Sequence, residues 1–246
     1  MTTATPAATA PVLSVGIPAH NEAKYIGRAI ESLLRSAQVA GEPIEVVVAL
    51  NRCTDATQAI AESLGARCVE EPRKCIAAVR NAAVRGGSAP IVLTLDADSW
   101  VGPRTLGAVM RKVRNPRWVG GGSWMTPERW SLGIVVTGFM VLRHMPDKRI
   151  SAGMFWCPRE VFDTLGGFDE SLVSLEDLHF AYRMKALGQQ RGQRYGTLYR
   201  HGIHTSTRKF DTFGDWYLVR HPDLLRRIFE GRDREATNLY YYDVDR

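Results

Sequence analysis

The sequence predicts an α/β protein built on a mixed, mostly parallel central β-sheet flanked by helices. Short apolar runs of strand length alternate with segments of helical apolar spacing up to about residue 100, and this alternation is typical of parallel sheets with helices on both faces. The run Ile44–Leu50 (IEVVVAL) is apolar almost throughout, as strands covered on both faces are. With 246 residues, 45% of them hydrophobic, the chain is long enough to bury a full core.

In the first half, each predicted strand is a short aliphatic run, and each predicted helix carries apolar residues along one face. Gly41 and Pro43 end the first helix, and Gly65 ends the second. Pro103 suits the first turn of a helix. The predicted strands are 13–17, 44–50, 67–70 and 91–95, and the predicted helices are 23–37, 55–64, 74–84 and 103–113.

The second half has a less regular pattern. We expect an extended glycine-rich segment at 118–125, an apolar helix at 129–145, a strand at 150–157, helices at 158–165 and 175–187, a strand at 195–200 and a final helix at 213–229. No internal repeat or long linker divides the chain, so residues 11–246 are predicted to form one domain. Residues 1–10 (MTTATPAATA) are predicted to be a disordered tail that lacks the features of a signal peptide. The longest apolar run, 132–142, is shorter than the ~20 residues of a membrane span.

Composition narrows the choice of function only slightly. The net charge of +6 fits a nucleic acid, an anionic membrane or a phosphorylated small molecule as partner, and equally a basic solvated surface. No nucleic-acid-binding motif is present, so we expect no nucleic acid partner. The four cysteines show no metal-binding spacing and are predicted to be reduced, as in a cytoplasmic protein.

Two aspartates follow the predicted strand 91–95 in the stretch IVLTLDADSW. Asp96 and Asp98 repel each other unless a cation lies beside them, and their oxygen ligands suit Mg²⁺ or Mn²⁺, which in turn bind phosphate oxygens. The alternative is a solvent-facing turn in which Asp98 caps the next helix. The position of the pair after a strand of a parallel sheet favours the metal site, because ligands bind beyond the carboxyl ends of such strands.

Three more polar stretches follow or adjoin predicted strands. They are PAHNE at 18–22, NRCTDAT at 51–57 and KCIAAVRN at 74–81. A parallel sheet would bring all of them to one edge, where amides, carboxylates and cations would form a rim suited to a nucleoside diphosphate.

PAHNE, NRCTDAT, the RN of Arg80–Asn81, DAD, GGFDE and EDLHFAYRMKALG together resemble the ordered motif set of the family 2 glycosyltransferases, which have the GT-A fold. The resemblance covers roughly residues 12–188 and implies a nucleotide-sugar donor, a divalent metal and inversion at the anomeric carbon by direct displacement. It also implies a nucleotide-binding half at 11–100 and an acceptor and catalytic half at 101–246.

The resemblance assigns residues to the donor site. Ala19, Asn21 and Glu22 would lie against the nucleoside. Asp55 would lie near the base or ribose, Asp96 beside the ribose, and Asp98 on the metal. The full predicted donor set is Pro18, Ala19, Asn21, Glu22, Asn51, Asp55, Lys74, Arg80, Asp96, Ala97, Gly153, Arg208 and Lys209. Many family members carry an aspartate where this chain has Asn51, so the base need not be uracil, because a carboxylate and an amide offer different hydrogen bonds.

An inverting transfer needs a general base for the acceptor hydroxyl and positive charge beside the leaving diphosphate. Asp177 is the predicted base by resemblance, and Glu176 would orient a neighbour or the acceptor. Both open a predicted helix, so helix capping is the structural alternative.

The segment 199–211 (YRHGIHTSTRKFD) combines two histidines with two adjacent cations. His204, and after it His201, are candidates for a further metal ligand, whereas Arg208 and Lys209 are candidates for the diphosphate. Hydrogen bonding within the fold is the alternative role for each histidine.

The apolar helix at 129–145 allows two interpretations: a buried helix beside the acceptor pocket, or a helix that contacts an anionic membrane from the cytoplasmic side. The acceptor is accordingly predicted to be a small molecule or a lipid-linked molecule, and a homodimer is compatible with the sequence. The alternative functions are a GT-A-fold sugar nucleotidyltransferase, a phosphotransferase that uses DAD as nucleophile, and a basic nucleic-acid binder. The nucleotidyltransferase would carry a glycine-rich loop with a lysine after the first strand, which PAHNE does not provide.

Overall fold

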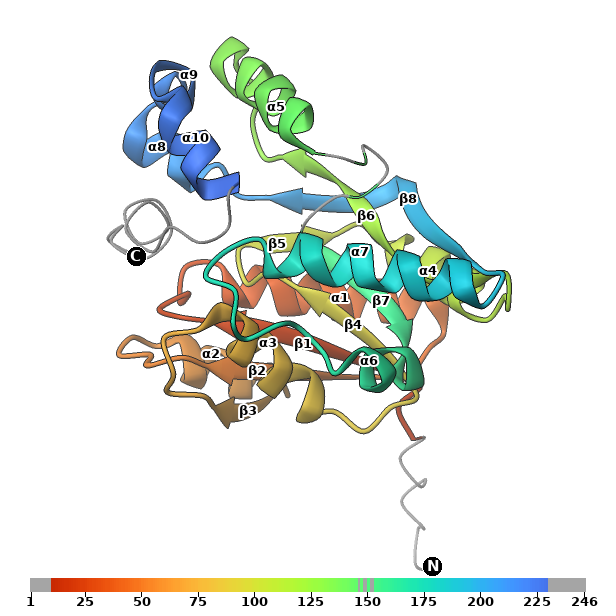
Figure 1. The fold of residues 1–246 in the computed structure, drawn as a ribbon. Coiled ribbons are helices and arrows are strands. Elements are labelled where there is room, and N and C mark those ends of the chain that lie inside the picture. Colours follow the sequence, from red (N-terminus) through yellow and green to blue (C-terminus); the bar gives the residue numbers. More distant parts are fainter. Residues whose placement is uncertain (1–9, 146, 148–149, 151–152, 230–246) are drawn as a thin grey trace, which may run out of the picture.

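The computed structural model describes residues 10–145, 147, 150 and 153–229 as one curled sheet covered by helices on both faces (Figure 1). The strands are β1 (Leu13–Ala19), β2 (Ile44–Leu50), β3 (Arg67–Glu70), β4 (Ile91–Leu95), β5 (Ser99–Val101), β6 (Trp118–Pro127), β7 (Met154–Pro158) and β8 (Arg194–Thr205). The helices are α1 (Ile26–Ala40), α2 (Thr57–Ser63), α3 (Ile76–Arg85), α4 (Thr105–Val113), α5 (Leu132–His144), α6 (Arg159–Leu165), α7 (Glu176–Gln190), α8 (Arg208–Phe213), α9 (Tyr217–Arg220) and α10 (Pro222–Phe229).

The eight strands of the sheet lie in the order β3-β2-β1-β4-β7-β6-β8-β5. β3, β2, β1 and β4 pair in parallel, as do β6 and β8, whereas β7 and β5 run antiparallel to their neighbours. The predicted mixed, mostly parallel sheet is therefore confirmed.

Each face of the sheet has its own hydrophobic core. Residues of α1 and α4 pack on one face and residues of α3, α6 and α7 on the other. Trp156 and Phe155 of β7 belong to opposite cores although they are adjacent, because successive side chains of a strand point to opposite faces. Because helices pack on both faces, the sheet is held in place, and the loops at its edges are held with it.

The predicted elements of the first half are all present, with small shifts at their ends. α1 begins at Ile26 rather than at Ala23, because the chain before it is held in a turn. The backbone N–H of Glu22 donates to Thr57 Oγ1 at 2.7 Å, and that of Ala23 donates to Asp55 Oδ2 at 2.9 Å.

The second half differs more from the predictions. The three-residue strand β5 was not predicted, and β8 continues to Thr205, where it pairs with Ser99. The predicted single helix at 213–229 is wrong: Gly214, with φ of +88°, ends α8, and Pro222 begins a separate helix, α10. Proline favours the first turn of a helix and breaks the interior of one.

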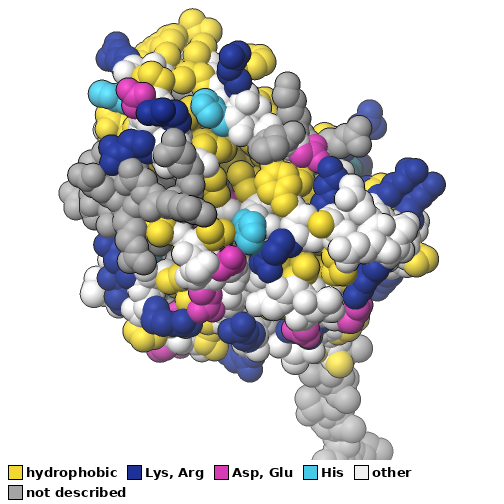
Figure 2. Space-filling model, in the orientation of Figure 1, with side chains coloured by type: hydrophobic (Ala, Val, Ile, Leu, Met, Phe, Trp, Pro, Cys, Tyr) yellow, Lys and Arg dark blue, Asp and Glu magenta, His cyan; other side chains and the backbone are white. Residues whose placement is uncertain are grey.

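α5 and α8–α10 stand together beyond the edge of the sheet (Figure 1). Leu218, Leu224, Leu225 and Ile228 form a small cluster against which residues of α5 pack. The predicted buried helix at 129–145 is only partly buried: Gly133, Ile134 and Thr137 of α5 are buried, whereas Leu132 is 68% exposed and Phe139 69% exposed. Figure 2 shows hydrophobic side chains gathered on this part of the surface.

No helix within the described residues combines the length and apolar character that a membrane crossing requires. The predicted tail at 1–10 lies outside the described residues, except for Ala10. The predicted membrane contact of α5 stays a prediction.

Candidate active site

The carboxyl ends of β1, β2 and β4 form one edge of the sheet, as predicted. Ala19, the last residue of β1, is in register with Leu50, the last residue of β2, and Asp96 directly follows β4. The segment after β8 joins this edge, because the backbone N–H of Ser206 donates to the carbonyl of Asp98 at 2.9 Å. Residues from distant parts of the chain therefore surround the DAD motif.

Arg80 of α3 lies at the centre of the first charge network. Its side chain is buried, its Nη1 lies 2.7 Å from Asp96 Oδ1, and its Nε donates to Glu176 Oε1 at 3.0 Å. Burial alone would lower the pKa of Arg80, but the carboxylates of Asp96 and Glu176 raise it above its ordinary value. Arg80 therefore stays charged and joins the end of β4 to the start of α7.

Asp177 follows Glu176 in the first turn of α7 and is half-buried. Burial raises the pKa of Asp177 to about 7, and the neighbouring carboxylate of Glu176 contributes to the rise, while the Arg80 guanidinium opposes it. Its Oδ1 accepts a hydrogen bond from the backbone N–H of Leu178 at 2.7 Å. A carboxyl group that exchanges its proton near neutral pH is suited to general base chemistry.

Arg208 lies at the centre of the second network. Its Nη1 and Nη2 donate to the two carboxylate oxygens of Glu22 at 2.5 and 2.8 Å, and its Nη2 lies 2.9 Å from Asp98 Oδ2. Its guanidinium also lies 5.2 Å from the centre of the Tyr25 ring. Burial would lower the pKa of Arg208, but Glu22 and Asp98 raise it. The two aspartates of DAD thus each contact a different arginine.

The predicted nucleoside contacts lie at the neighbouring strand ends and bind backbone atoms. Asn21 Oδ1 accepts a hydrogen bond from the N–H of Thr54 at 2.8 Å. Asp55 accepts hydrogen bonds from Thr57 and Ala23. Burial would raise the pKa of Asp55, but these bonds lower it. These side chains shape the loops of the rim.

Asn51 explains one departure from the family pattern. Its buried amide donates to the carbonyl oxygens of Glu71 at 2.6 Å and Arg73 at 2.8 Å. A carboxylate has no hydrogen to donate to these acceptors. The amide at this position therefore holds the 71–73 backbone, a role that the sequence alone did not indicate.

The other predicted donor-site residues differ in position. Pro18, Ala19 and Ala97 are buried at the edge of the sheet. Gly153, with φ of +88°, approaches the site closely, because a Cβ there would lie 3.8 Å from Asp96 Oδ2 and 2.7 Å from Met125 Cε. Lys74 is exposed before α3, and Lys209 is half-buried beside Arg208.

The described residues contain no group of three or more His, Cys, Asp or Glu side chains that could hold a metal ion. His204 is exposed, and its ring stacks on Trp100 with 5.9 Å between ring centres. His201 lies elsewhere, in a surface pocket with Arg104 and Arg111. Asp98 still fits a hard cation, because Mg²⁺ is commonly held by one or two carboxylates with water and substrate phosphates as its other ligands.

Sequence reasoning missed Tyr25 and Tyr195. Tyr195 lies on β8, and its buried hydroxyl has no hydrogen-bond partner among the described residues. Burial raises the pKa of this hydroxyl, and the nearby carboxylate of Asp177 raises it further. Tyr25 lies three positions after the end of PAHNE, so proximity to that motif was the only available signal. Tyr195 lies in a predicted strand with no motif around it.

The arrangement is that of the GT-A fold, and solved glycosyltransferases share it. A mannosyltransferase from Pyrobaculum calidifontis, solved with GDP-Man and Mn²⁺, has a TM-score of 0.61 and 19% identity over 90% of this chain and 61% of that one. TarS residues 1–349 from S. aureus, solved with UDP, has a TM-score of 0.62 and 18% identity over 92% of this chain and 68% of that one. Glucosyl-3-phosphoglycerate synthase from Mycobacterium tuberculosis, solved with Mn²⁺, UDP and phosphoglyceric acid, has a TM-score of 0.58 and 17% identity over 91% and 80% of the two chains.

The family follows from the sequence match. Residues 14–162 match Glycosyl transferase family 2, and the chain belongs to this family of sugar-transferring enzymes. It is also 26% identical, over 89% of its length, to validoxylamine A glucosyltransferases from Streptomyces hygroscopicus subsp. jinggangensis (strain 5008) and subsp. limoneus. The chain spans 63% and 59% of the lengths of these two relatives.

Proposed function

We propose that this chain moves a sugar from a nucleotide-diphosphate sugar to an acceptor hydroxyl with inversion at the anomeric carbon. One observation carries the proposal most: Asp96 and Asp98 of the DAD motif and Asp177 from a distant segment lie around two arginines, one buried and one half-buried. The family match and the neighbours solved with UDP or GDP-Man support a nucleotide-sugar donor. Residues 11–100 would hold the nucleotide, and residues 101–246 would supply the base and the acceptor side.

Asp177 is the proposed general base. In its ionised form it would take the proton of the acceptor hydroxyl while the acceptor oxygen bonds to the anomeric carbon and the bond from that carbon to the diphosphate breaks. The pKa of about 7 favours this step near neutral pH. Glu176 would act as a positioning residue, because its carboxylate is engaged by Arg80.

Asp98 and Arg208 would serve the departing nucleoside diphosphate. A divalent cation, Mg²⁺ or Mn²⁺, bound to Asp98 would neutralise charge on the diphosphate; two of the neighbours were solved with Mn²⁺. Arg208 contacts Asp98 directly, so its guanidinium lies where diphosphate oxygens would approach that carboxylate and its cation. Lys209 would add a second positive charge beside it, and His204 stays a candidate metal ligand.

The names of the two relatives indicate which sugar is transferred and what kind of molecule accepts it. They are named validoxylamine A glucosyltransferases, so we propose a glucosyl donor and a small-molecule acceptor rather than a lipid-linked one. The acceptor would approach from the side of α5 and α8, since α8 carries Arg208 and the helices that follow it, α9 and α10, pack against α5 (Figure 1).

The test is a thermal-shift panel of UDP, GDP, UDP-glucose and GDP-mannose, each with and without Mn²⁺, on the native chain, Asp98→Asn and the control Asp163→Asn. Asp163 is an exposed acid on α6, away from the rim. A bound nucleotide raises the melting temperature as its concentration passes its dissociation constant. We expect a Mn²⁺-dependent shift in the native chain and in Asp163→Asn, and none in Asp98→Asn.

If no nucleotide shifts melting under any metal condition, the donor assignment is wrong. Release of pyrophosphate from a nucleoside triphosphate and a sugar phosphate would instead identify a nucleotidyltransferase.

A further inference from the structure

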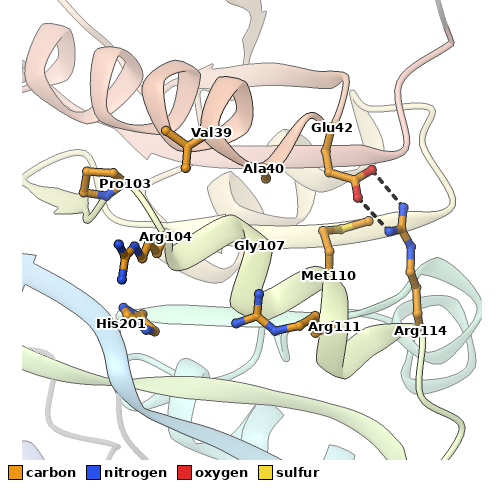
Figure 3. A pocket seen from close by; sticks show the side chains of 10 residues that line it. All are labelled: Val39, Ala40, Glu42, Pro103, Arg104, Gly107, Met110, Arg111, Arg114 and His201. Atoms are coloured by element: carbon orange, nitrogen blue, oxygen red, sulfur yellow. Dashed lines mark hydrogen bonds and ion pairs between the residues drawn. The ribbon is translucent and has the colours of Figure 1, made fainter.

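A pocket lies on the surface between the end of α1, helix α4 and strand β8 (Figure 3). Its volume is about 290 Å³. α1 starts beside PAHNE and has 15 residues, so its far end lies roughly 22 Å from the rim at 1.5 Å per residue. None of the residues of the predicted donor set lines the pocket, so it is distinct from the proposed donor site.

The pocket is lined by an excess of positive charge. Arg104 precedes α4, Arg111 lies two turns along it, and His201 comes from β8; Figure 3 shows these three side chains on the same side of the pocket. The one acidic residue in the lining, Glu42, is paired with Arg114, whose Nη1 lies 2.6 Å from Glu42 Oε1. The positive charges of Arg104 and Arg111 are therefore not neutralised by an acidic residue of the lining.

His201 reaches the pocket through an irregularity of β8. It adopts φ of +60°, in the left-handed region, which is uncommon for residues other than glycine, although histidine, like asparagine and aspartate, is enriched there. The register between β6 and β8 shifts between Ser123 and Met125, opposite this segment. At Gly202 a Cβ would lie only 2.1 Å from the carbonyl oxygen of Trp124. Bulges of this kind re-aim side chains, and strained backbone gathers at ligand sites.

Gly107 keeps the floor of the pocket open. A Cβ at this position would lie 3.6 Å from Arg111 Nη1 and 3.7 Å from Ala40 Cβ, distances of ordinary contact. Packing therefore does not require glycine here, although glycine is unfavourable inside a helix. The absent side chain leaves room in front of Arg111 for another molecule.

We propose that this pocket binds a small phosphate-bearing ligand. Arginine presents a planar fork of donors that matches phosphate oxygens, and two such forks line the pocket together with the imidazole of His201. A volume of about 290 Å³ lies at the lower end of the range for small-molecule sites. It suits a phosphomonoester or the headgroup of an anionic phospholipid.

The test follows the imidazole NMR signals of His201 while inorganic phosphate is added. A local signal is needed because the donor site can also bind phosphate. We expect a saturable shift of the His201 signals, with affinity at least tenfold weaker in Arg111→Gln and in Gly107→Leu, which fills the pocket without changing its charge. Arg35→Gln, an exposed arginine on the outer side of α1, should bind as the native chain does.

Glycerol phosphate and vesicles containing phosphatidic acid then separate the two sources of the ligand. A shift with the soluble ester and no vesicle binding indicates a metabolite site, and vesicle binding that Gly107→Leu abolishes indicates a headgroup site. The proposal is overturned if phosphate leaves the His201 signals unchanged at tens of millimolar, or if Gly107→Leu responds like the native chain. Circular dichroism of each variant reports whether it is folded.

Discussion

The two arginines that contact the DAD motif sit in different environments. Arg80 emerges from a helix that packs on the sheet, and its side chain is 6% exposed; Arg208 emerges from a short helix at the rim, and its side chain is 19% exposed. Arg80 joins Asp96 to a carboxylate on α7, whereas Arg208 joins Asp98 to Glu22 in the loop after β1. The same ion-pair chemistry is thus placed once inside the fold and once where substrate would arrive.

The difference suggests separate tasks. A buried arginine between two carboxylates is costly to lose, because each carboxylate is then left without its partner. Arg208 also has a buried partner, Glu22, but its own side chain is more exposed than that of Arg80, so its fork of donors can also meet the oxygens of a phosphate at the rim. We therefore expect loss of Arg80 to affect mainly stability and loss of Arg208 to affect turnover as well.

The largest effect is expected for Arg80→Gln. This change leaves Asp96 and Glu176 facing each other without compensation, and should lower the free energy of unfolding by about 3–5 kcal/mol in urea denaturation at neutral pH. Arg85→Gln is the matched control on the same helix, since Arg85 is exposed and 4.0 Å from its nearest acid, Glu170. Equal stability of the two variants would remove the distinction between the arginines.

Arg208→Gln should lower kcat about 10²–10³-fold, the range measured when a single group that stabilises transition-state charge is removed. It should also lower the free energy of unfolding, by less than Arg80→Gln does, because the buried carboxylate of Glu22 loses its guanidinium partner. Arg208→Lys should recover part of the rate because it keeps the charge but loses the fork. Steady-state kinetics with saturating donor and Mn²⁺ would measure this, with the exposed Arg220→Gln as control. A full rate in Arg208→Gln would exclude its role at the diphosphate.

A smaller effect is expected for Asn51→Asp. The aspartate would direct a carboxylate at the carbonyl oxygens of Glu71 and Arg73, and should lower the free energy of unfolding by about 1–3 kcal/mol. Asn115→Asp is the control, because that side chain accepts a hydrogen bond from the N–H of Arg117 and aspartate can do the same. Should Asn51→Asp be as stable as its control, the amide would have another role.

The donor edge was predictable because strand ends are marked locally. Runs such as IEVVVAL and IVLTL are unbroken, and polar residues follow each of them directly, so the parallel order of the strands was enough to place PAHNE, NRCTDAT and DAD on one edge. The pairing of Arg80 with Glu176, which is 96 positions away, has no local signal. It depends on how α7 crosses the sheet.

The acceptor side was less predictable for the same reason. The apolar spacing continues through Gly214 and Pro222 and so predicts one helix at 213–229, although Gly214 ends α8 and Pro222 begins α10 in the structure. β5 has only three residues, too few to show an alternating pattern of apolar side chains. The bulge that places His201 arises from the pairing of β8 with β6. Contacts between distant segments decide these features.

The most direct test of the role of Asp177 is the pH dependence of kcat/KM. The base must be ionised to accept a proton, and burial raises the pKa of Asp177 to about 7, so kcat/KM should rise with pH, reach half its maximum near 7 and level off above it. Asp177→Asn should abolish transfer while still showing the Mn²⁺-dependent thermal shift with donor. A pH profile that is flat from 5 to 8, or native turnover in Asp177→Asn, would contradict the assignment of the base.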